Sequence, residues 1–239
     1  MNRYIYILSL FVGVFFLSSC DEHEAVAAVD MYYHPGYIVC DDGEVYSSVE
    51  ELKESNSKAF AVICSELLDD TRYLAVLLTE QEDLAFCTAY TSTGASYDIS
   101  AYNGFSNTVA MQSVNSIDST SVPGIKLKIE CPVALNAFNS HAVGQSDFLP
   151  SVAELRMLYS NKYVVNKTLS SLAQEGYDVD LISYNTPEKG WLWTSTEVEE
   201  NPTNQAWLFS MFSGTMQETP KTQEHPSRLI MNYYQFTNQ

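Results

Sequence analysis

The chain has 239 residues, of which 46% are hydrophobic and 13% aromatic, and it carries 30 acidic residues against 12 basic ones. This length suits one globular domain or two small ones, and the apolar content excludes disorder as the general state. The formal net charge of −18 excludes nucleic acid and anionic bilayers as default partners, because both require a cationic protein face.

The N-terminal residues indicate export. A basic residue, Arg3, precedes an apolar stretch from Ile5 to Leu17. That stretch is too short to cross a bilayer, which takes about 20 residues, so it predicts a signal peptide over residues 1–19. Its Leu-Ser-Ser-Cys ending resembles the bacterial lipobox, which implies acylation of Cys20 and attachment to a membrane through lipid. The alternative is an ordinary secretory signal with an incidental cysteine.

Residues 20–30 are acidic and Ala-rich, which predicts a flexible tether between the lipid and a single domain over residues 31–239. An acidic run directly after the lipidated cysteine resembles an export signal of some Gram-negative lineages. The sequence therefore predicts an outer-membrane lipoprotein displayed on the cell surface. A periplasm-facing anchor is the alternative.

The other cysteines are Cys40, Cys64, Cys87 and Cys131. An even number in an oxidising compartment permits two disulfides with three possible connectivities. Buried free thiols are the alternative. Because no two of these cysteines form a Cys-x-x-Cys pair, the sequence does not predict a zinc site, and it implies no other metal and no cofactor.

The first half of the chain reads mainly as short strands. Two strands over 37–46 flank an Asp-Asp-Gly turn, as in a β-hairpin, and the polar stretch 48–58 favours a short helix. Apolar runs over 59–64 and 73–78, separated by a turn at Asp69-Asp70, predict buried strands. Residues 91–122 are rich in Ser, Thr, Asn, Gly and Tyr and predict a long ordered loop or a linker.

The second half adds helices. A strand over 125–129 and a short helix from Pro132 to Phe138 come first. Ser151 and Glu154 have the spacing of a capping box, which predicts a helix burying Val152, Leu155, Leu158 and Tyr159. A second helix is expected from Asn166 to Gly176, burying Leu169, Leu172 and Ala173. Strands over 191–195, 206–212 and 229–236 follow, with a turn at Ser213-Gly214, and the order predicts an α+β fold with an antiparallel sheet.

Several of these segments resemble the Lcl C-terminal-like domain family, a family of unknown function. The similar segments are Asp147-Phe148-Leu149-Pro150-Ser151 followed by Glu154-Leu155, Trp191-Leu192-Trp193-Thr194-Ser195-Thr196-Glu197, Ala206-Trp207 leading to Phe212-Ser213-Gly214 and then to Lys221, Arg228 and Phe236, and, upstream, Tyr102 to Thr108. The resemblance covers roughly residues 35–238 and is strongest from 147 onwards. It implies a C-type-lectin-like fold with a twisted antiparallel sheet, two main helices and long loops.

Most motif residues read as structural. Their large apolar or helix-capping side chains suit a core that packs helices onto the sheet. The set comprises Leu149, Pro150, Ser151, Glu154, Leu155, Trp191, Trp193, Ser195, Trp207 and Gly214.

The sequence shows no complete catalytic constellation. His141 and Asp147 could be grouped with a serine, but no Gly-x-Ser-x-Gly motif accompanies them. A calcium site could be built from acidic residues between Glu197 and Asn201 or from Asp178 and Asp180. The lectin signals Glu-Pro-Asn and Trp-Asn-Asp are absent, however, so a solvated acidic loop is the simpler interpretation. Because no catalytic grouping is complete, we expect no catalysis.

The tyrosines and polar loops favour recognition, because aromatic faces stack on sugars or anchor proteins. The sequence predicts a lipid-anchored binding or adhesion module for a protein or a neutral glycan, acting through loops 91–122 and 197–205. The alternative is a structural accessory subunit of a surface fibre or envelope complex. The candidate ligand-binding residues are Tyr102, Asn103, Asn107, Glu197, Glu199 and Asn201.

Overall fold

The computed structural model describes residues 32–114, 118–122, 125–138 and 146–235. The predicted signal peptide, the predicted lipidation site Cys20, the predicted tether and His141 lie outside the described residues. None of the helices in the described part combines the length and the apolar character needed to span a bilayer.

The fold is mixed α+β, as predicted, and the strand pairs of its sheets are antiparallel. The largest sheet has the order β12 (Ile230–Tyr234), β4 (Arg72–Leu77), β3 (Ala59–Ile63), β1 (Ile38–Cys40) and β2 (Val45–Tyr46). A three-stranded sheet has the order β10 (Met216–Pro220), β9 (Gln205–Ser210) and β8 (Trp191–Glu197). Two-stranded sheets join β11 (Glu224–Ser227) to β5 (Gln81–Ala85) and β6 (Asp118–Val122) to β7 (Ile125–Lys128).

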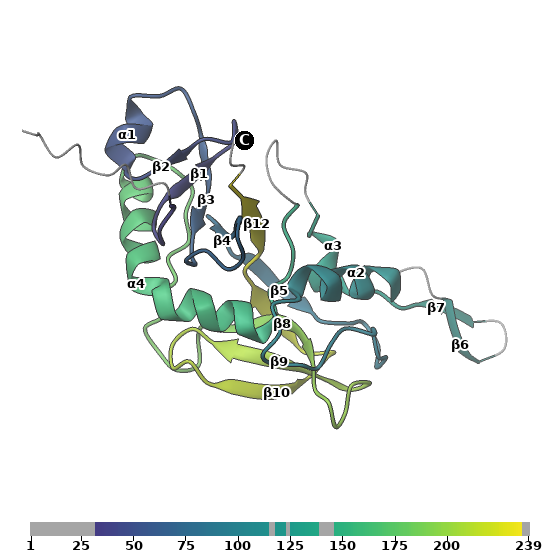
Figure 1. Cartoon of the computed structure of the whole chain (residues 1–239). Coiled ribbons are helices and arrows are strands. Elements are labelled where there is room, and N and C mark those ends of the chain that lie inside the picture. Colours follow the sequence, from purple (N-terminus) through teal and green to yellow (C-terminus); the bar gives the residue numbers. More distant parts are fainter. Residues whose placement is uncertain (1–31, 115–117, 123–124, 139–145, 236–239) are drawn as a thin grey trace, which may run out of the picture. The chain divides into compact units, whose positions relative to one another are not determined.

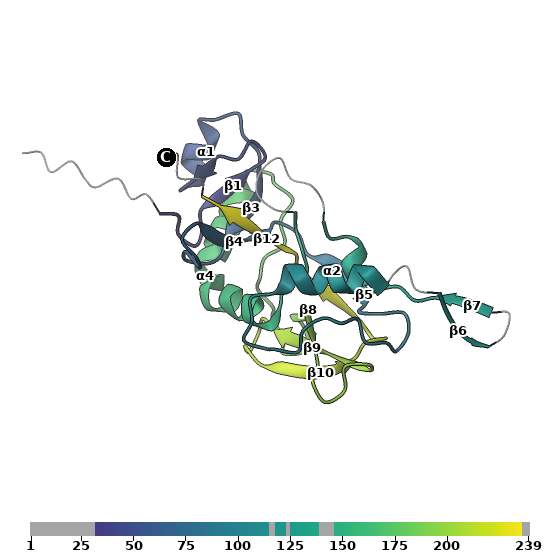
Figure 2. The ribbon, with the colours of Figure 1, turned by 45° about the vertical axis from the view of Figure 1, so that its right-hand side comes forward.

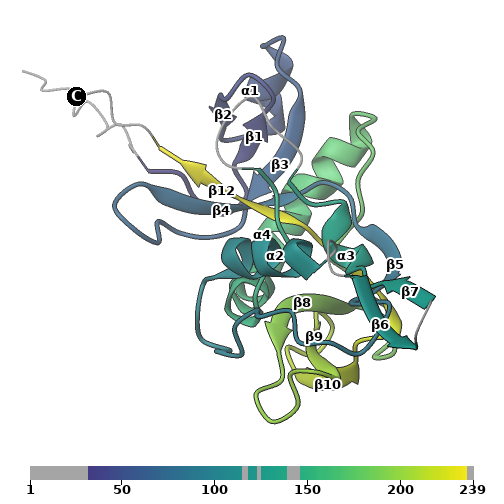
Figure 3. The ribbon, with the colours of Figure 1, turned by 90° about the vertical axis from the view of Figure 1, so that its right-hand side faces the viewer.

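The described helices are α1 (Val49–Lys53), α2 (Gly104–Val114), α3 (Pro132–Leu135) and α4 (Val152–Gln174). Figures 1 and 3 show α2 and the first part of α4 between the five-stranded sheet and the three-stranded sheet, and Figure 1 shows the rest of α4 running beside the five-stranded sheet towards α1. Figure 2 shows β6 and β7 as a separate hairpin that follows α2. The short helix α1 begins after Ser48, whose hydroxyl accepts a hydrogen bond from the Glu51 amide.

Successive side chains of the five-stranded sheet point to opposite faces and therefore belong to two different hydrophobic clusters. One face packs against α4 and contributes Ile38, Cys40, Val62, Leu74, Val76 and Ile230 to the main core. The opposite face forms a second cluster of Val39, Ala61, Ile63, Tyr73, Ala75, Met231 and Tyr233, partly covered by Tyr33 and Tyr37. Both faces are apolar, which explains the nearly unbroken hydrophobic runs in these strands.

Helix α4 begins as predicted and continues further than predicted. Ser151 accepts from the Glu154 amide while the Glu154 carboxylate accepts from the Ser151 amide, which is the expected capping box. The prediction of a separate helix from Asn166 was wrong, because α4 is continuous over 23 residues. Its end was predicted correctly, since Gly176 adopts a positive φ of 89° just beyond the cap. Ala173, expected to be buried, is exposed.

Figure 1 shows α4 bending between its two halves. Near the bend, Ser160 Oγ donates to the Arg156 carbonyl at 3.0 Å and Asn161 Nδ2 donates to the Cys64 carbonyl at 3.0 Å. A hydroxyl that bonds back to the preceding turn tends to bend a helix. The first half thus reaches β8, where the Val152 amide donates to Thr196 Oγ1 at 3.1 Å, while the second half lies beside the segment before β1, where Thr168 Oγ1 donates to the Gly36 carbonyl at 2.7 Å.

The long segment 91–122 is neither a loop throughout nor a linker between domains, because it contains α2 and β6. Three motif segments meet at the start of this helix. Thr108 Oγ1 donates to the Gly104 carbonyl at 2.7 Å and accepts from the Leu149 amide at 3.1 Å. The Pro150 carbonyl accepts from the Ser195 amide at 2.7 Å. The motif residues therefore hold α2, α4 and β8 together.

Gly104 is required at this junction. A Cβ there would lie 2.2 Å from Glu154 Oε2 and 2.7 Å from the Leu149 carbonyl oxygen, closer than any side-chain carbon can sit without displacing the backbone. The glycine lets the first turn of α2 approach the buried Glu154 carboxylate, and its amide lies 3.4 Å from Glu154 Oε1.

Burial gives Glu154 a measurable role in the pH dependence of stability. Desolvation raises its pKa from 4.5 to about 7. Between these values the folded chain holds a proton that the unfolded chain has released, so stability falls as pH rises from 4.5 to 7. Between pH 5 and pH 8 we expect the free energy of unfolding of the wild type to fall by on the order of 2 kcal/mol through this group. Glu154→Gln can still act in a capping box but does not titrate, so it should not show this fall. Urea unfolding of both proteins at pH 5 and pH 8 measures it. Parallel pH profiles of the two proteins would contradict the assignment.

Candidate functional site

The two loops proposed as a binding surface do meet, through Glu197. Its Oε1 accepts from the Thr93 amide at 2.8 Å and its Oε2 accepts from Ser92 Oγ at 3.2 Å. The Glu197 amide also donates to the Ser96 carbonyl at 3.1 Å. The end of β8 is thereby bonded directly to the segment that precedes α2.

The Lys221 ammonium fills the centre of this meeting point. It donates to Glu197 Oε1, to the Thr91 carbonyl at 2.8 Å and to the Pro202 carbonyl at 2.7 Å. It also lies 5.1 Å from the centroid of the Phe86 ring. Both charged side chains are buried, at 0% and 1% exposed. An internal cation therefore holds the loops together here, where a ligand cavity was expected.

The other predicted ligand residues divide into two groups. Asn107 is buried, accepts from the Ser96 amide at 2.9 Å and donates to Asn103 Oδ1 at 3.0 Å. Asn201 bonds to Asn204 and Gln205 in its own turn. These side chains and Glu197 are engaged within the protein, so their observed role is structural. Tyr102 and Glu199 are exposed.

Tyr102 borders a small cavity against α4. With Ser100, Ala153, Arg156, Met157 and Ser160 it encloses about 220 Å³. Loop 197–205 contributes no residue to this cavity. The two predicted loops therefore do not share it.

A different cavity combines an aromatic side chain with ionisable groups, and we call it the Trp191 cavity. It has a volume of about 280 Å³ and is lined by Glu80, Asp83, Tyr184, Glu188, Lys189, Gly190, Trp191, His225 and Pro226. These residues come from β5 and the turn before it, from the segment between α4 and β8, from the first residue of β8, and from β11. A neighbouring cavity of about 490 Å³ shares Glu80, Asp83, Tyr184 and Pro226.

The position of Tyr184 is fixed from two sides. Its hydroxyl donates to Glu80 Oε2 at 2.5 Å. Its ring packs on Gly190, where a Cβ would lie 2.5 Å from the ring and where φ is +82°. Burial raises the pKa of Tyr184, with Glu80 adding to the effect, and burial also raises the pKa of Glu80. The phenol therefore stays protonated and acts as the donor of this hydrogen bond.

Trp191 and His225 give the cavity its aromatic wall. Trp191 is half-buried, and its Nε1 donates to the Pro187 carbonyl at 3.0 Å, which fixes the indole. His225 lies edge-on to the buried Trp193 ring, with centroids 5.4 Å apart. Desolvation lowers the pKa of His225, so the neutral imidazole, which can donate at one nitrogen and accept at the other, prevails at pH 7.

Acidic side chains dominate the rest of the lining. Across the two adjoining cavities they are Glu80, Glu82, Asp83, Asp180 and Glu188, against one lysine, Lys189. Among the described residues, no group of three or more His, Cys, Asp or Glu side chains is placed to hold a metal ion. The arrangement offers hydrogen-bond acceptors beside an aromatic surface, which suits a ligand rich in hydroxyl donors.

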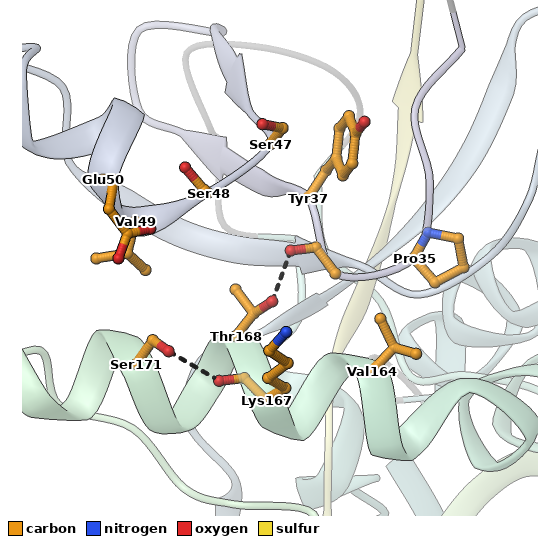
Figure 4. Close-up of a pocket in the computed structure, with 11 residues that line it drawn as sticks. Pro35, Tyr37, Ser47, Ser48, Val49, Glu50, Val164, Lys167, Thr168 and Ser171 are labelled. Carbon is orange, nitrogen blue, oxygen red and sulfur yellow. Dashed lines mark hydrogen bonds between the residues drawn. The ribbon is translucent and has the colours of Figure 1, made fainter. Parts of the chain in front are cut away.

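A groove along α4 is larger, at about 360 Å³, and is lined on one side by Lys167, Thr168 and Ser171 (Figure 4). Its serine and threonine hydroxyls are already bonded within the protein. Thr168 Oγ1 donates to the Gly36 carbonyl at 2.7 Å and Ser171 Oγ to the Lys167 carbonyl at 3.1 Å. On the opposite side, Ser47 Oγ donates to Glu51 Oε2 at 2.8 Å. The groove is lined by fewer charged side chains, Glu50 and Lys167, than the Trp191 cavity.

Sequence reasoning assigned Trp191 to the core and missed the other residues of the Trp191 cavity. The signal that could have indicated the site is the polar, turn-rich segment 185–190 directly before Trp191, because such a segment leaves the first residue of a strand open to solvent. The chain was compared with protein-family models, with curated proteins and with solved structures, and none of these matches it.

Proposed function

We propose that the protein is a non-catalytic binding module of the cell envelope, held to the outer membrane by a lipid on Cys20, and that it binds a neutral glycan in the Trp191 cavity. The observation that carries the proposal is a half-buried indole beside acceptor carboxylates and a neutral imidazole. Sugar rings stack on aromatic faces while their hydroxyls donate to carboxylates. The acidic lining and a net charge of −18 disfavour polyanionic glycans.

We further propose that residues 31–239 form a single C-type-lectin-like domain of the Lcl C-terminal-like type. The junction of α2, α4 and β8 supports this, since it is built from the segments that resemble the family.

A glycan array probed with and without a calcium chelator tests the function. We expect a reproducible neutral glycan hit that survives chelation. Trp191→Ala should weaken that binding about 30-fold, the loss typical of a central aromatic contact. Tyr102→Ala, which removes an exposed aromatic in the loop first predicted to bind, serves as the matched control and should leave binding unchanged. If Tyr102→Ala loses glycan binding while Trp191→Ala keeps it, the binding site lies in the loop of Tyr102 and not in the Trp191 cavity.

A structural accessory role is the second candidate, favoured by two exposed aromatic side chains. Tyr163 is 81% exposed and Phe212 41% exposed, and both line a cavity of about 200 Å³ beside Lys162. Exposed aromatics of this kind often anchor a protein partner. If the protein co-purifies with a fibre component, and Tyr163→Ser abolishes that association while glycan binding is absent, this role replaces the first.

A further inference from the structure

Two of the buried cysteines lie against each other. Cys87 Sγ and Cys131 Sγ are 2.7 Å apart, and both residues are 0% exposed. None of the four described cysteines forms a disulfide in this structure. Cys87 follows β5 by two residues and Cys131 caps α3, so two distant parts of the chain meet at this point.

The residues next to these two cysteines are hydrogen-bonded to each other. The Thr88 amide donates to the Glu130 carbonyl at 2.8 Å, and the Glu130 amide donates to Thr88 Oγ1 at 3.0 Å. Thr88 and Glu130 are the immediate neighbours of the two cysteines. Segments held side by side in this way bring their α-carbons within the range that a disulfide spans, at most about 7 Å.

Cys40 and Cys64 do not have this geometry. In the β1–β3 pair, Cys40 is opposite Ala59 and Ile38 is opposite Val62. The Ile63 carbonyl then accepts from the Gly36 amide, so Cys64 lies near the level of residue 36. The level of residue 36 is four strand residues from Cys40, a distance of roughly 13 Å. Cys40 and Cys64 are therefore too far apart to form a disulfide.

We propose that Cys87 and Cys131 form a disulfide in the exported protein, while Cys40 and Cys64 remain free thiols. The oxidant is the disulfide of a thiol–disulfide oxidoreductase. One cysteine thiolate attacks it to form a mixed disulfide, and the second cysteine displaces the carrier as a thiol. One disulfide is formed, one is reduced, and the two protons lost by the Cys87 and Cys131 thiols end on the carrier's two thiols. Burial of both sulfurs places this exchange during folding, before the segments close.

The bridge stabilises the part of the chain around the buried cation. It closes the segment 88–130, which contains α2 and the Thr91 carbonyl that accepts from Lys221. The Cys87 amide also donates to the Lys221 carbonyl at 3.0 Å. Reduction would therefore loosen the attachment of this segment to β8 and to the residues around Lys221.

Peptide mapping of the full chain, isolated from cell envelopes and alkylated under denaturing conditions without reductant, tests the proposal. Trypsin separates Cys87, in peptide 73–126, from Cys131, in peptide 129–156. We expect these two peptides to be joined and to separate on reduction, and Cys40 and Cys64 to carry the alkyl label. Alkylation of Cys87 and Cys131, or a bridge to Cys40 or Cys64, would overturn the proposal.

A second measurement does not depend on the digest. A disulfide that closes a segment of this length raises the Tm by on the order of 10 °C. Reductant should therefore lower the Tm of the wild-type protein by about that amount. It should not change the Tm of the Cys87→Ser, Cys131→Ser double variant. An equal response to reductant in both proteins would also overturn the proposal.

Discussion

Replacing Lys221 with methionine is expected to destabilise the protein by about 3–5 kcal/mol. The substitution keeps most of the side-chain volume but removes the ammonium that bonds Glu197, the Thr91 carbonyl and the Pro202 carbonyl. Glu197 is 1% exposed, so its carboxylate would remain buried without a cation. Urea unfolding of the wild type and Lys221→Met measures the difference in the free energy of unfolding.

Two controls isolate the buried pair. Lys53 and Glu175 form an exposed pair with nitrogen and oxygen 2.5 Å apart and side chains 52% and 35% exposed. Lys53→Met should change stability by less than about 1 kcal/mol. Adding Glu197→Leu to Lys221→Met should restore part of the loss, because it removes the orphaned charge. An effect at Lys221 no larger than that at Lys53 would contradict the role of the internal cation.

Truncating Trp193 to alanine is expected to cost about 3–5 kcal/mol. Its side chain is 0% exposed and packs edge-on against Phe86, with ring centroids 5.4 Å apart. Its Nε1 donates to the Leu84 carbonyl at 2.9 Å, so alanine would leave both a cavity and an unpaired carbonyl. The same unfolding measurement tests this expectation.

Trp207 is the matched comparison, because it is only partly buried in the neighbouring strand β9. Trp207→Ala should cost about 1–2 kcal/mol, in proportion to the smaller apolar area that it removes from water. Equal losses in the free energy of unfolding at the two positions would contradict the larger contribution to the core that we assign to Trp193.

The sequence predicted most local elements of the fold. The first hairpin, α1, β3, β4, the start of α3 and the capping box of α4 lie where alternation and turn residues indicated. These elements depend on contacts between residues close in the chain, and such contacts leave a periodic pattern. Strand β5 was missed because its partner among the described strands is β11, far along the chain, and its Gln-Glu-Asp start carries no strand pattern.

Helix α2 was missed for a related reason. Its buried face is formed by Gly104, Asn107, Thr108, Met111 and Val114, which have helical spacing, but Asn107 and Thr108 are polar. Asn107 and Thr108 satisfy the backbone of Ser96 and Leu149. A search for apolar periodicity cannot detect a helix whose buried side chains are chosen for hydrogen bonding.

The site was harder to predict than the fold. Glu197 was expected at a binding surface because acidic loop residues often bind ligands or cations, and its partner Lys221 lies 24 residues away in sequence. Residues of the Trp191 cavity come from separate segments between Glu80 and Pro226, and only the folded chain brings them together.

Fluorine NMR of protein labelled with 5-fluorotryptophan tests the proposed binding site most directly. The chain has three tryptophans, so three resonances are expected, and Trp191→Phe identifies one of them. Titration with the neutral glycan found on the array should shift the Trp191 resonance and leave those of Trp193 and Trp207 in place. Saturable binding that leaves the Trp191 resonance unmoved would show that the glycan is held elsewhere.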